Sequence, residues 1–305
     1  MTTSTSPITQ ATEKSLTRGL TNNSNNSNES KVNPKQLQLE LRGERIDIDR
    51  ETLILFPESL TLNIISDGLS LHQLLYEPTS VPEKIHSFDF DPRCFRYIAS
   101  FFEQTRQLSL KQQPEYTMPP LSVSDTNFLA EAAHRQIIIL LREELDYFVL
   151  PQSSIIDKNE ETLQSSQKNQ VKGGMEKNMQ QMKTQAGRHL VEENKVFESL
   201  VRNIEKENNL AEQHLISVLY EAGFDYQDQW AYRDLEPKRT CVMSVSLSHL
   251  NVTGSNRRAD ILKRLMMFWK KPARKCWWDY DHISLNDNTI RLWKRRTFWL
   301  ELAMA

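Results

Sequence analysis

Two pairs of aspartates have a spacing that could support phosphoryl-transfer chemistry: Asp89 with Asp91, and Asp279 with Asp281. In that chemistry the first carboxylate attacks a phosphoryl group and the second acts as acid and base, assisted by a distant lysine and a further acidic pair on Rossmann-like strands. The sequence around both pairs lacks this context. Asp91 precedes Pro92, and this dipeptide is better explained as the cap and first residue of a helix, because the carboxylate accepts hydrogen bonds from the free amides of the first turn.

The other residue types with catalytic or metal-binding potential show no productive spacing. The seven histidines share no ligand pattern, and the three cysteines lie far apart, which fits reduced thiols inside a cell better than a zinc site or a disulfide framework. No nucleophile-elbow, P-loop, dinucleotide or zinc-protease motif occurs in the sequence. We therefore predict a protein that is not an enzyme and uses no metal or cofactor.

A basic, tryptophan-rich segment near the C-terminus is the candidate interaction site. Arginine and tryptophan contribute much of the binding energy of protein interfaces, and clustered cations favour acidic partners. Further cations and tryptophans alternate shortly after it, in the segment IRLWKRRTFW. The candidate partner-binding residues are Lys270, Lys271, Arg274, Lys275, Trp277, Trp278, Arg295 and Arg296.

Three alternatives to an acidic protein partner stay open for this segment. The tryptophans can form a core, with the cations solvated around it or docked against an acidic part of the chain. Anionic lipid is a second ligand class, limited to peripheral contact because the longest aliphatic run, Ile137 to Leu141, is too short to span a membrane. Single-stranded nucleic acid also uses aromatic residues beside cations, but the net charge of −2 argues against a nucleic-acid partner.

The charges are unevenly distributed along the chain. Residues 36–150 carry 10 Lys and Arg against 18 Asp and Glu, a net charge of −8, whereas residues 257–296 carry 12 against 4, a net charge of +8. The two segments are therefore expected to attract each other or to recruit different partners.

The composition divides the chain into four segments, and the predicted fold class is α+β. Residues 1–35 are rich in Ser, Thr and Asn and are predicted to be a disordered tail. Residues 36–150 are predicted to form the first folded domain, and residues 151–188 a flexible linker rich in Gln, Lys, Asn and Ser. Residues 189–305 are predicted to hold a helical segment and a smaller α+β domain, with one helix at about 257–269.

The first predicted domain should open with a β-hairpin and close with helices. Leucines at alternate positions from 37 to 41 precede Gly43, and isoleucines at 46 and 48 follow it, as in two half-buried strands joined by a tight turn. After the cap at Asp91, apolar residues recur on one helix face at Phe95, Ile98, Ala99 and Phe102. A loop is predicted at 106–123, and a final helix through Ile138, Leu141 and Leu145 to Phe148.

The order of these motifs resembles the potassium-channel-tetramerisation-domain (KCTD-like) branch of the BTB/POZ family. The hairpin, the segment FDFDPRCFRYIASFF and the closing LREELDYFVLP follow each other as they do in that branch. The turn has one glycine, Gly43, where the branch usually has two, and the zinc-binding pattern of some channel members has no counterpart. The resemblance implies a tetramerisation-type BTB domain over residues 36–150 and a homo-oligomer assembled through it, without a bridging metal.

The C-terminal motifs resemble a fungal set of BTB proteins related to the yeast Whi-type growth and stress regulator. In that set a CWW turn precedes a strand with the pattern W.RR...LE, as in KCWWDYD and IRLWKRRTFWLELAM here. The resemblance implies a cytoplasmic adaptor that recruits a plasma-membrane-associated phosphatase and restrains TOR growth signalling under nutrient stress. Peripheral contact with the plasma membrane and partial nuclear presence are alternative locations. The wider BTB family implies another function, that of a substrate adaptor of a cullin-type ubiquitin ligase.

Overall fold

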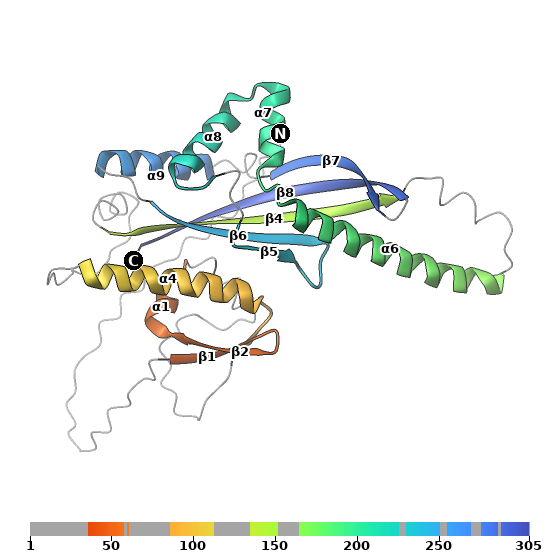
Figure 1. Cartoon of the computed structure of the whole chain (residues 1–305), viewed down its shortest axis with the longest axis horizontal. Helices are drawn as coiled ribbons and strands as arrows, with labels where there is room; N and C mark the ends of the chain where they lie inside the picture. The colour runs from red at the N-terminus through yellow and green to blue at the C-terminus, as the bar shows by residue number, and fades with distance from the viewer. Residues whose placement is uncertain are drawn as a thin grey trace, which may run out of the picture. The chain divides into compact units, whose positions relative to one another are not determined.

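A computed structural model describes residues 36–57, 60, 86–112, 135–151, 165–225, 230–250, 255–269, 276–285 and 288–304. In this part of the chain the structure contains two β-sheets and six helices, which confirms the predicted α+β class (Figure 1). The predicted disordered tail, and residues 152–164 of the predicted linker, lie outside the described residues.

The first sheet has the strand order β2-β1-β3 and begins with the predicted hairpin. Strands β1 (Gln36–Leu41) and β2 (Glu44–Asp49) pair antiparallel, and β3 (His86–Phe88) pairs parallel with β1. The turn between β1 and β2 consists of Arg42 and Gly43, whose φ angles are 49° and 84°. Positive φ at both central residues is the geometry that matches the twist of a two-residue hairpin, so the prediction is confirmed.

Helix α4 (Pro92–Gln112) follows this sheet and starts at the predicted cap. Asp91 Oδ1 accepts hydrogen bonds from the backbone amides of Arg93, at 2.8 Å, and Cys94, at 3.2 Å. Three residues of the predicted apolar face, Phe95, Ile98 and Phe102, are buried in a core shared with β1 and β2, and the partly buried Ala99 packs against this core. The loop predicted at 106–123 is wrong for residues 106–112, which continue the helix, and the remainder of that loop lies outside the described residues.

A short helix, α1 (Arg50–Ile54), is tied to α4 by a polar cluster. Glu103 of α4 accepts hydrogen bonds from Thr52 of α1 and, at 3.1 Å, from Arg106. Arg106 also pairs with Asp49 at 3.1 Å and with Glu51. The hydrogen bonds from Arg106 and Thr52 lower the pKa of the Glu103 carboxyl to about 2, so the cluster favours the ionised form.

The second sheet has the strand order β5-β6-β4-β8-β7 and is antiparallel throughout. Its strands are β4 (Ile137–Pro151), β5 (Tyr232–Leu235), β6 (Cys241–His249), β7 (Cys276–Leu285) and β8 (Asn288–Met304). The helix predicted to end at Phe148 is therefore wrong, since these residues form β4. The run from Ile137 to Leu141 is buried on both sides, as in a central strand whose two faces are covered.

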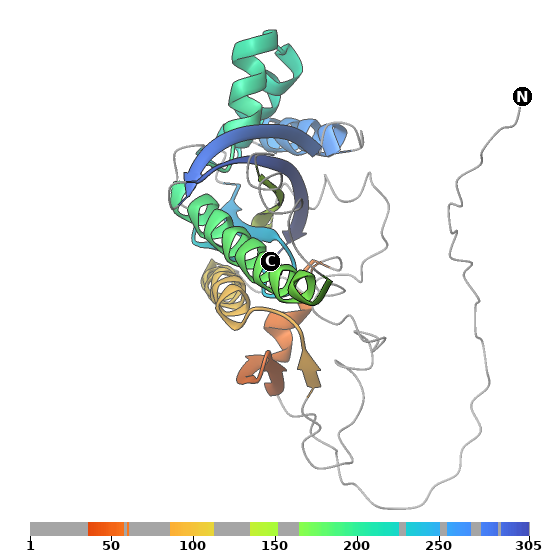
Figure 2. The same ribbon diagram turned by 90° about the vertical axis from the view of Figure 1, so that its right-hand side faces the viewer.

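The helices cover opposite faces of the second sheet (Figures 1 and 2). On one face, Ile138 and Leu140 of β4 belong to the core that includes α4 and the hairpin. On the other face, Ile139 and Leu141 pack with α7 (Glu198–Glu207), α8 (Leu210–Glu221) and α9 (Ser255–Trp269). The predicted helical segment and the helix predicted at about 257–269 are therefore confirmed. Gly223 follows the end of α8 with a φ of 95°, a conformation typical of a glycine at a helix C-terminus.

Helix α6 (Ser165–Glu193) occupies most of the segment predicted to be a flexible linker. The linker prediction is wrong for residues 165–188, because the end of this polar helix packs on the second sheet through Ala186 and Leu190. Gly187 permits the close approach: a Cβ atom there would lie 2.3 Å from Tyr147 Oη and 2.5 Å from Leu235 Cδ2.

Replacing the cap of α4 tests whether Asp91 has a structural role. We expect Asp91→Ala to lower the free energy of unfolding by about 1 kcal/mol, because two amides of the first turn lose their acceptor. Asp89→Ala is the matched control: Asp89 is paired at the surface with Arg42 and Lys238, and its loss should cost less, below about 1 kcal/mol. Urea denaturation of both variants measures the difference. An equal or larger effect of Asp89→Ala would contradict the capping role.

The lowered pKa of Glu103 predicts a specific loss of stability in acid. A carboxyl whose folded pKa is lowered stabilises the fold above its unfolded pKa, which is 4.5 here, and this contribution disappears as the pH falls towards about 2. Glu103→Gln should therefore show a weaker decline in its denaturation midpoint than the wild type between about pH 5 and pH 3. Parallel curves for the two proteins in this range would show that Glu103 is not linked to folding.

Candidate functional site

The alternation of side chains along β8 separates its cations into two groups. Lys294 and Arg296 point to the face covered by α6 and α7, where their side chains are 1% and 2% exposed. Arg291 and Arg295 point to the other face, and the Arg295 side chain is 45% exposed. Because successive residues of a strand face opposite sides, neighbouring arginines of the same motif have different surroundings.

The two inward cations of β8, Lys294 and Arg296, form ion pairs with buried or partly buried carboxylates. Glu143 of β4 is fully buried and pairs with Arg296 at 2.7 Å and with Arg233 of β5. Arg296 also donates to the Ser199 hydroxyl, at 3.0 Å, and to the carbonyl oxygen of Lys195, at 2.8 Å. These contacts join β4, β5 and β8 to α7, at Ser199, and to the segment that precedes it, at Lys195.

The second aspartate pair belongs to the same interior. Lys294 contacts Asp279, Asp281 and Glu198 at 3.4, 2.5 and 3.1 Å. Burial would lower the pKa of Lys294, but the three carboxylates outweigh it and raise that pKa. Burial likewise would raise the pKa of Asp281, but Lys294 and Arg202 outweigh it, so that pKa is lowered. Both aspartates thus lie in a network of structural ion pairs on antiparallel strands.

The outward group lies on an exposed surface that we call the aromatic face. Trp278 of β7 is 56% exposed and stacks on Phe148 of β4, with ring centroids 6.4 Å apart. The Arg295 guanidinium lies 5.8 Å from the Trp278 ring, and Arg142 lies 5.3 Å from the Trp299 ring. The aromatic face consists of Phe148, Leu150, Trp278, Tyr280, Trp293 and Trp299 with Arg291, Arg295 and Arg142, the last of which is buried against Trp299.

One end of the aromatic face surrounds Arg291. Its guanidinium lies 4.2 Å from the Tyr280 ring and 5.0 Å from the Trp293 ring. Arginine above an aromatic ring is stabilised by the negative face of the ring. An exposed group of large aromatic side chains interleaved with arginines is the composition typical of a protein-binding surface.

The structure brings only part of the sequence-predicted site together. Trp278 and Arg295 are exposed neighbours on the aromatic face. Trp277 is 6% exposed, packs against Phe298 and donates from Nε1 to Glu212 at 2.7 Å. With Arg296 it lies in the interior, where neither side chain is available to a partner. The other four candidates, Lys270, Lys271, Arg274 and Lys275, lie outside the described residues.

Several residues of the aromatic face were absent from the predicted set. Phe148 ends the helix that the sequence predicts there, and Tyr280 lies between the two aspartates of the second pair. Arg291, Trp293 and Trp299 alternate along β8, so a strand period of two would have placed them on one face with Arg295. The missing information was the pairing with β4 and β7, which is not encoded locally.

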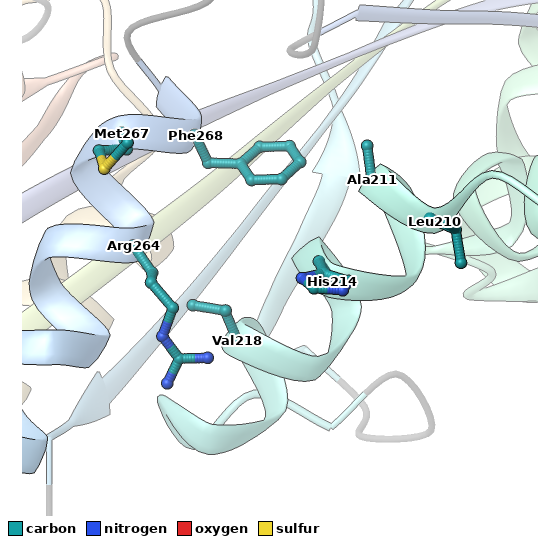
Figure 3. A pocket seen from close by; sticks show the side chains of 7 residues that line it. All are labelled: Leu210, Ala211, His214, Val218, Arg264, Met267 and Phe268. Carbon is teal, nitrogen blue, oxygen red and sulfur yellow. The ribbon is translucent and has the colours of Figure 1, made fainter.

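A hollow of about 360 Å³ lies between α8 and α9 (Figure 3). It is lined by Leu210, Ala211, His214, Val218, Arg264, Met267 and Phe268. Arg264 is already paired with Glu221, at 3.0 Å, and with Asp260, also at 3.0 Å. The hollow therefore offers apolar surface and one neutralised cation, without a convergence of acid, base and nucleophile.

The described residues contain no cluster of three His, Cys, Asp or Glu side chains that could hold a metal ion. In the same part of the chain, no helix has the length and apolar character needed to cross a bilayer.

The chain is similar over most of its length to proteins from two fungi. It is 29% identical over 280 residues to a WHI2-like protein of Schizosaccharomyces pombe, covering 89% of this chain and 88% of the relative. An uncharacterized protein of the same organism is 23% identical over 276 residues, covering 89% and 87%. A growth regulation protein of Saccharomyces cerevisiae is 24% identical over 313 residues, covering 86% of this chain and 60% of that protein. No family model matches, and these similarities support the relation to the fungal Whi-type proteins.

The buried ion pairs predict a large difference between the two groups of β8 cations. Glu143→Leu should destabilise the protein by about 3–5 kcal/mol, because Arg233 and Arg296 lose their buried carboxylate. Arg295→Gln removes two surface contacts, with Asp146, 3.0 Å from Arg295 Nε, and with the Trp278 ring, and should cost less than about 1 kcal/mol. Urea denaturation of both variants compares the costs. Similar small costs would show that the inward network is not needed for stability.

Proposed function

We propose that this protein is a non-enzymatic adaptor in growth regulation that binds a protein partner through its aromatic face. The observation that carries the proposal is the exposure of Trp278, Tyr280, Trp299 and Phe148 on one side of β4, β7 and β8. Side chains of this size are normally covered, so their exposure together favours a surface that a partner covers. The relatives named WHI2-like and growth regulation protein support the cellular role.

Within this role we propose recruitment of a phosphatase in nutrient-stress and TOR signalling, from a cytoplasmic position with at most peripheral membrane contact. Support comes from the resemblance of the C-terminal motifs to Whi-type proteins. The aspartate pairs support the non-enzymatic part of the proposal, because Asp91 caps α4 and the carboxylates of Asp279 and Asp281 lie beside Lys294. A nucleic-acid partner is not proposed.

We also propose that residues 36–150 include a BTB-type unit through which the chain forms homo-oligomers. The hairpin and the cap of α4 support the resemblance, whereas β4 pairs with strands from the C-terminal part of the chain. A fragment ending at residue 150 would expose β4 without its neighbours. Self-association is therefore best measured on the full chain, by light scattering at tens of micromolar.

A cullin adaptor is the alternative function, and one observation favours it. Leu108 and Leu110 of α4 are 49% and 64% exposed, which gives the end of this helix an apolar surface. The final helix predicted through Ile138 to Phe148 is not formed, because these residues belong to β4, so it cannot add a second helix to such a surface. A cullin pull-down with Leu108→Glu and Leu110→Glu distinguishes this alternative from phosphatase recruitment.

Single substitutions on the aromatic face test the proposed function. We expect Trp278→Ala and Arg295→Glu to keep the thermal melt of the wild type, because both side chains are exposed, and to lose most of the phosphatase recovered in affinity purification from nutrient-limited cells. Met267→Ala is the matched control, an exposed apolar residue of α9 away from this face. Full recovery of the phosphatase by both face variants, with unchanged melts, would exclude the aromatic face as its binding surface.

A further inference from the structure

Strand β7 forms a border of the second sheet. It pairs with β8 over ten residues, from Cys276 opposite Thr297 to Leu285 opposite Asn288. Among the described residues no strand pairs with its other edge. A strand rises about 3.3 Å per residue, so this edge offers roughly 33 Å of backbone whose outward amides and carbonyls lack a strand partner in the described part of the chain.

Three of the usual protections of an edge strand, namely lysine, proline and a β-bulge, are missing from β7. Edge strands are commonly guarded against further pairing by lysine, proline or a β-bulge. The sequence CWWDYDHISL contains neither lysine nor proline, and its pairing with β8 proceeds residue by residue without a bulge. Its two aspartates, Asp279 and Asp281, are on the inner face, where Lys294 contacts both. The edge is therefore chemically suited to accept another strand.

Arg291 differs from the other arginines of the aromatic face in having no counterion among the described residues. Arg142 pairs with Glu144, and Arg295 pairs with Asp146. No described carboxylate pairs with Arg291, and its buried Nε has no hydrogen-bond partner in the same set of residues. An unmatched guanidinium in a partly buried position is a site for an incoming carboxylate, because charge-assisted hydrogen bonds are among the stronger ones.

The guanidinium of Arg291 extends from β8 towards β7, the edge strand of the sheet. Its backbone is in β8, but its guanidinium lies 4.2 Å from the ring of Tyr280, which is a residue of β7. His282 of β7 is directly opposite Arg291 in the strand register. A strand added to β7 would lie about 4.8 Å further out, within reach of an acidic side chain directed to this face.

We propose that the free edge of β7 binds an extended acidic segment of the partner protein as an additional strand, with a carboxylate of that segment paired to Arg291. The inference rests on the proposed function, since it assigns a binding mode and a partner chemistry to the aromatic face. In strand addition the backbone supplies affinity and alternate side chains supply specificity. In such a strand, every second side chain points to the aromatic face, where Tyr280 and Arg291 lie. The side chains between them point to the opposite face of the sheet, where Asp279 and Asp281 lie.

The same geometry disfavours a polyanion as the ligand. Two of the three arginines on this face are already neutralised by Glu144 and Asp146. A nucleic acid or an anionic membrane gains its affinity from many cations at once. In the described part of this face, a single unmatched cation beside an open strand edge instead suits a peptide with one well-placed carboxylate.

Backbone-modified peptides test the binding mode on the full-length protein. The probe is a fluorescein-labelled nine-residue peptide with alternating Glu and Val, measured by fluorescence anisotropy. One derivative is N-methylated at the odd positions and one at the even positions, so that only one of them loses the amides that face β7. We expect one derivative to bind about tenfold more weakly than the parent peptide and the other to bind within about twofold of it. Equal effects of the two modifications, or no binding of the parent peptide at millimolar protein, would overturn the proposal.

Charge substitution tests the role of Arg291. Arg291→Gln should lower the affinity for the Glu-containing peptide about tenfold. The same substitution should leave the affinity for a peptide with Gln in place of Glu unchanged, so that the effects of the two changes are coupled. Arg264→Gln is the control and should have less than about threefold effect on binding of the peptide, because Arg264 lies on α9, away from the aromatic face, and is paired with Glu221 and Asp260. Absence of coupling between Arg291 and the peptide carboxylate would refute the pairing.

The outcomes separate this inference from the proposed function. If phosphatase recovery depends on Trp278 but the N-methylated peptides behave alike, the partner uses the aromatic face without adding a strand, and the inference fails alone. If phosphatase recovery is independent of Trp278 while the peptide binds as expected, the edge is a strand-binding site and the proposed partner is wrong.

Discussion

The alternation of side chains along β4 is the constraint on which the other parts of the structure depend. Its even-numbered residues begin in the core beneath α4, with Ile138 and Leu140, and end on the aromatic face with Phe148. Its odd-numbered residues pack with the helices on the opposite face or, at Glu143, hold two arginines. A shift of one residue in its pairing would expose this carboxylate and bury the aromatic face, so the buried ion pairs and the exposed surface specify the same register.

The opposite charges of the two halves of the chain are used within the fold. Glu143 and Asp146, from the acidic segment, pair with Arg296 and Arg295 of the basic segment. The cations of β8 are therefore mainly structural, in agreement with the alternative in which the basic segment docks against the acidic one. Arg291 has no such carboxylate among the described residues. The identity of this unpaired cation therefore matters more for partner binding than the total number of cations in the segment.

Local signals in the sequence predicted the elements whose structure is decided locally. The hairpin turn at Gly43 and the cap at Asp91 depend on residues within a few positions, and both were found. Strand β4 was mistaken for a helix because Ile138, Leu141 and Leu145 also fit helical spacing, and its partners lie about a hundred or more residues away in the sequence. Helix α6 resembled a linker because it is mostly polar and packs near its end, through Ala186 and Leu190. The tryptophan-rich segment was located, but its inner and outer residues could not be separated before the strands were known.

The near-neutral charge of the aromatic face determines what kind of selectivity it can have. Arg142 and Arg295 are already paired, so most of the energy of binding the proposed partner would come from covering aromatic surface. Among the described residues of this face, the Arg291 guanidinium is the cation through which electrostatics would contribute. The affinity of such a surface for a partner depends little on the total negative charge of the partner. It depends mainly on the spacing in the partner between one carboxylate and the neighbouring apolar side chains. An adaptor that must distinguish one client among many acidic proteins needs this form of recognition, because charge alone attracts them all and is weakened by physiological salt.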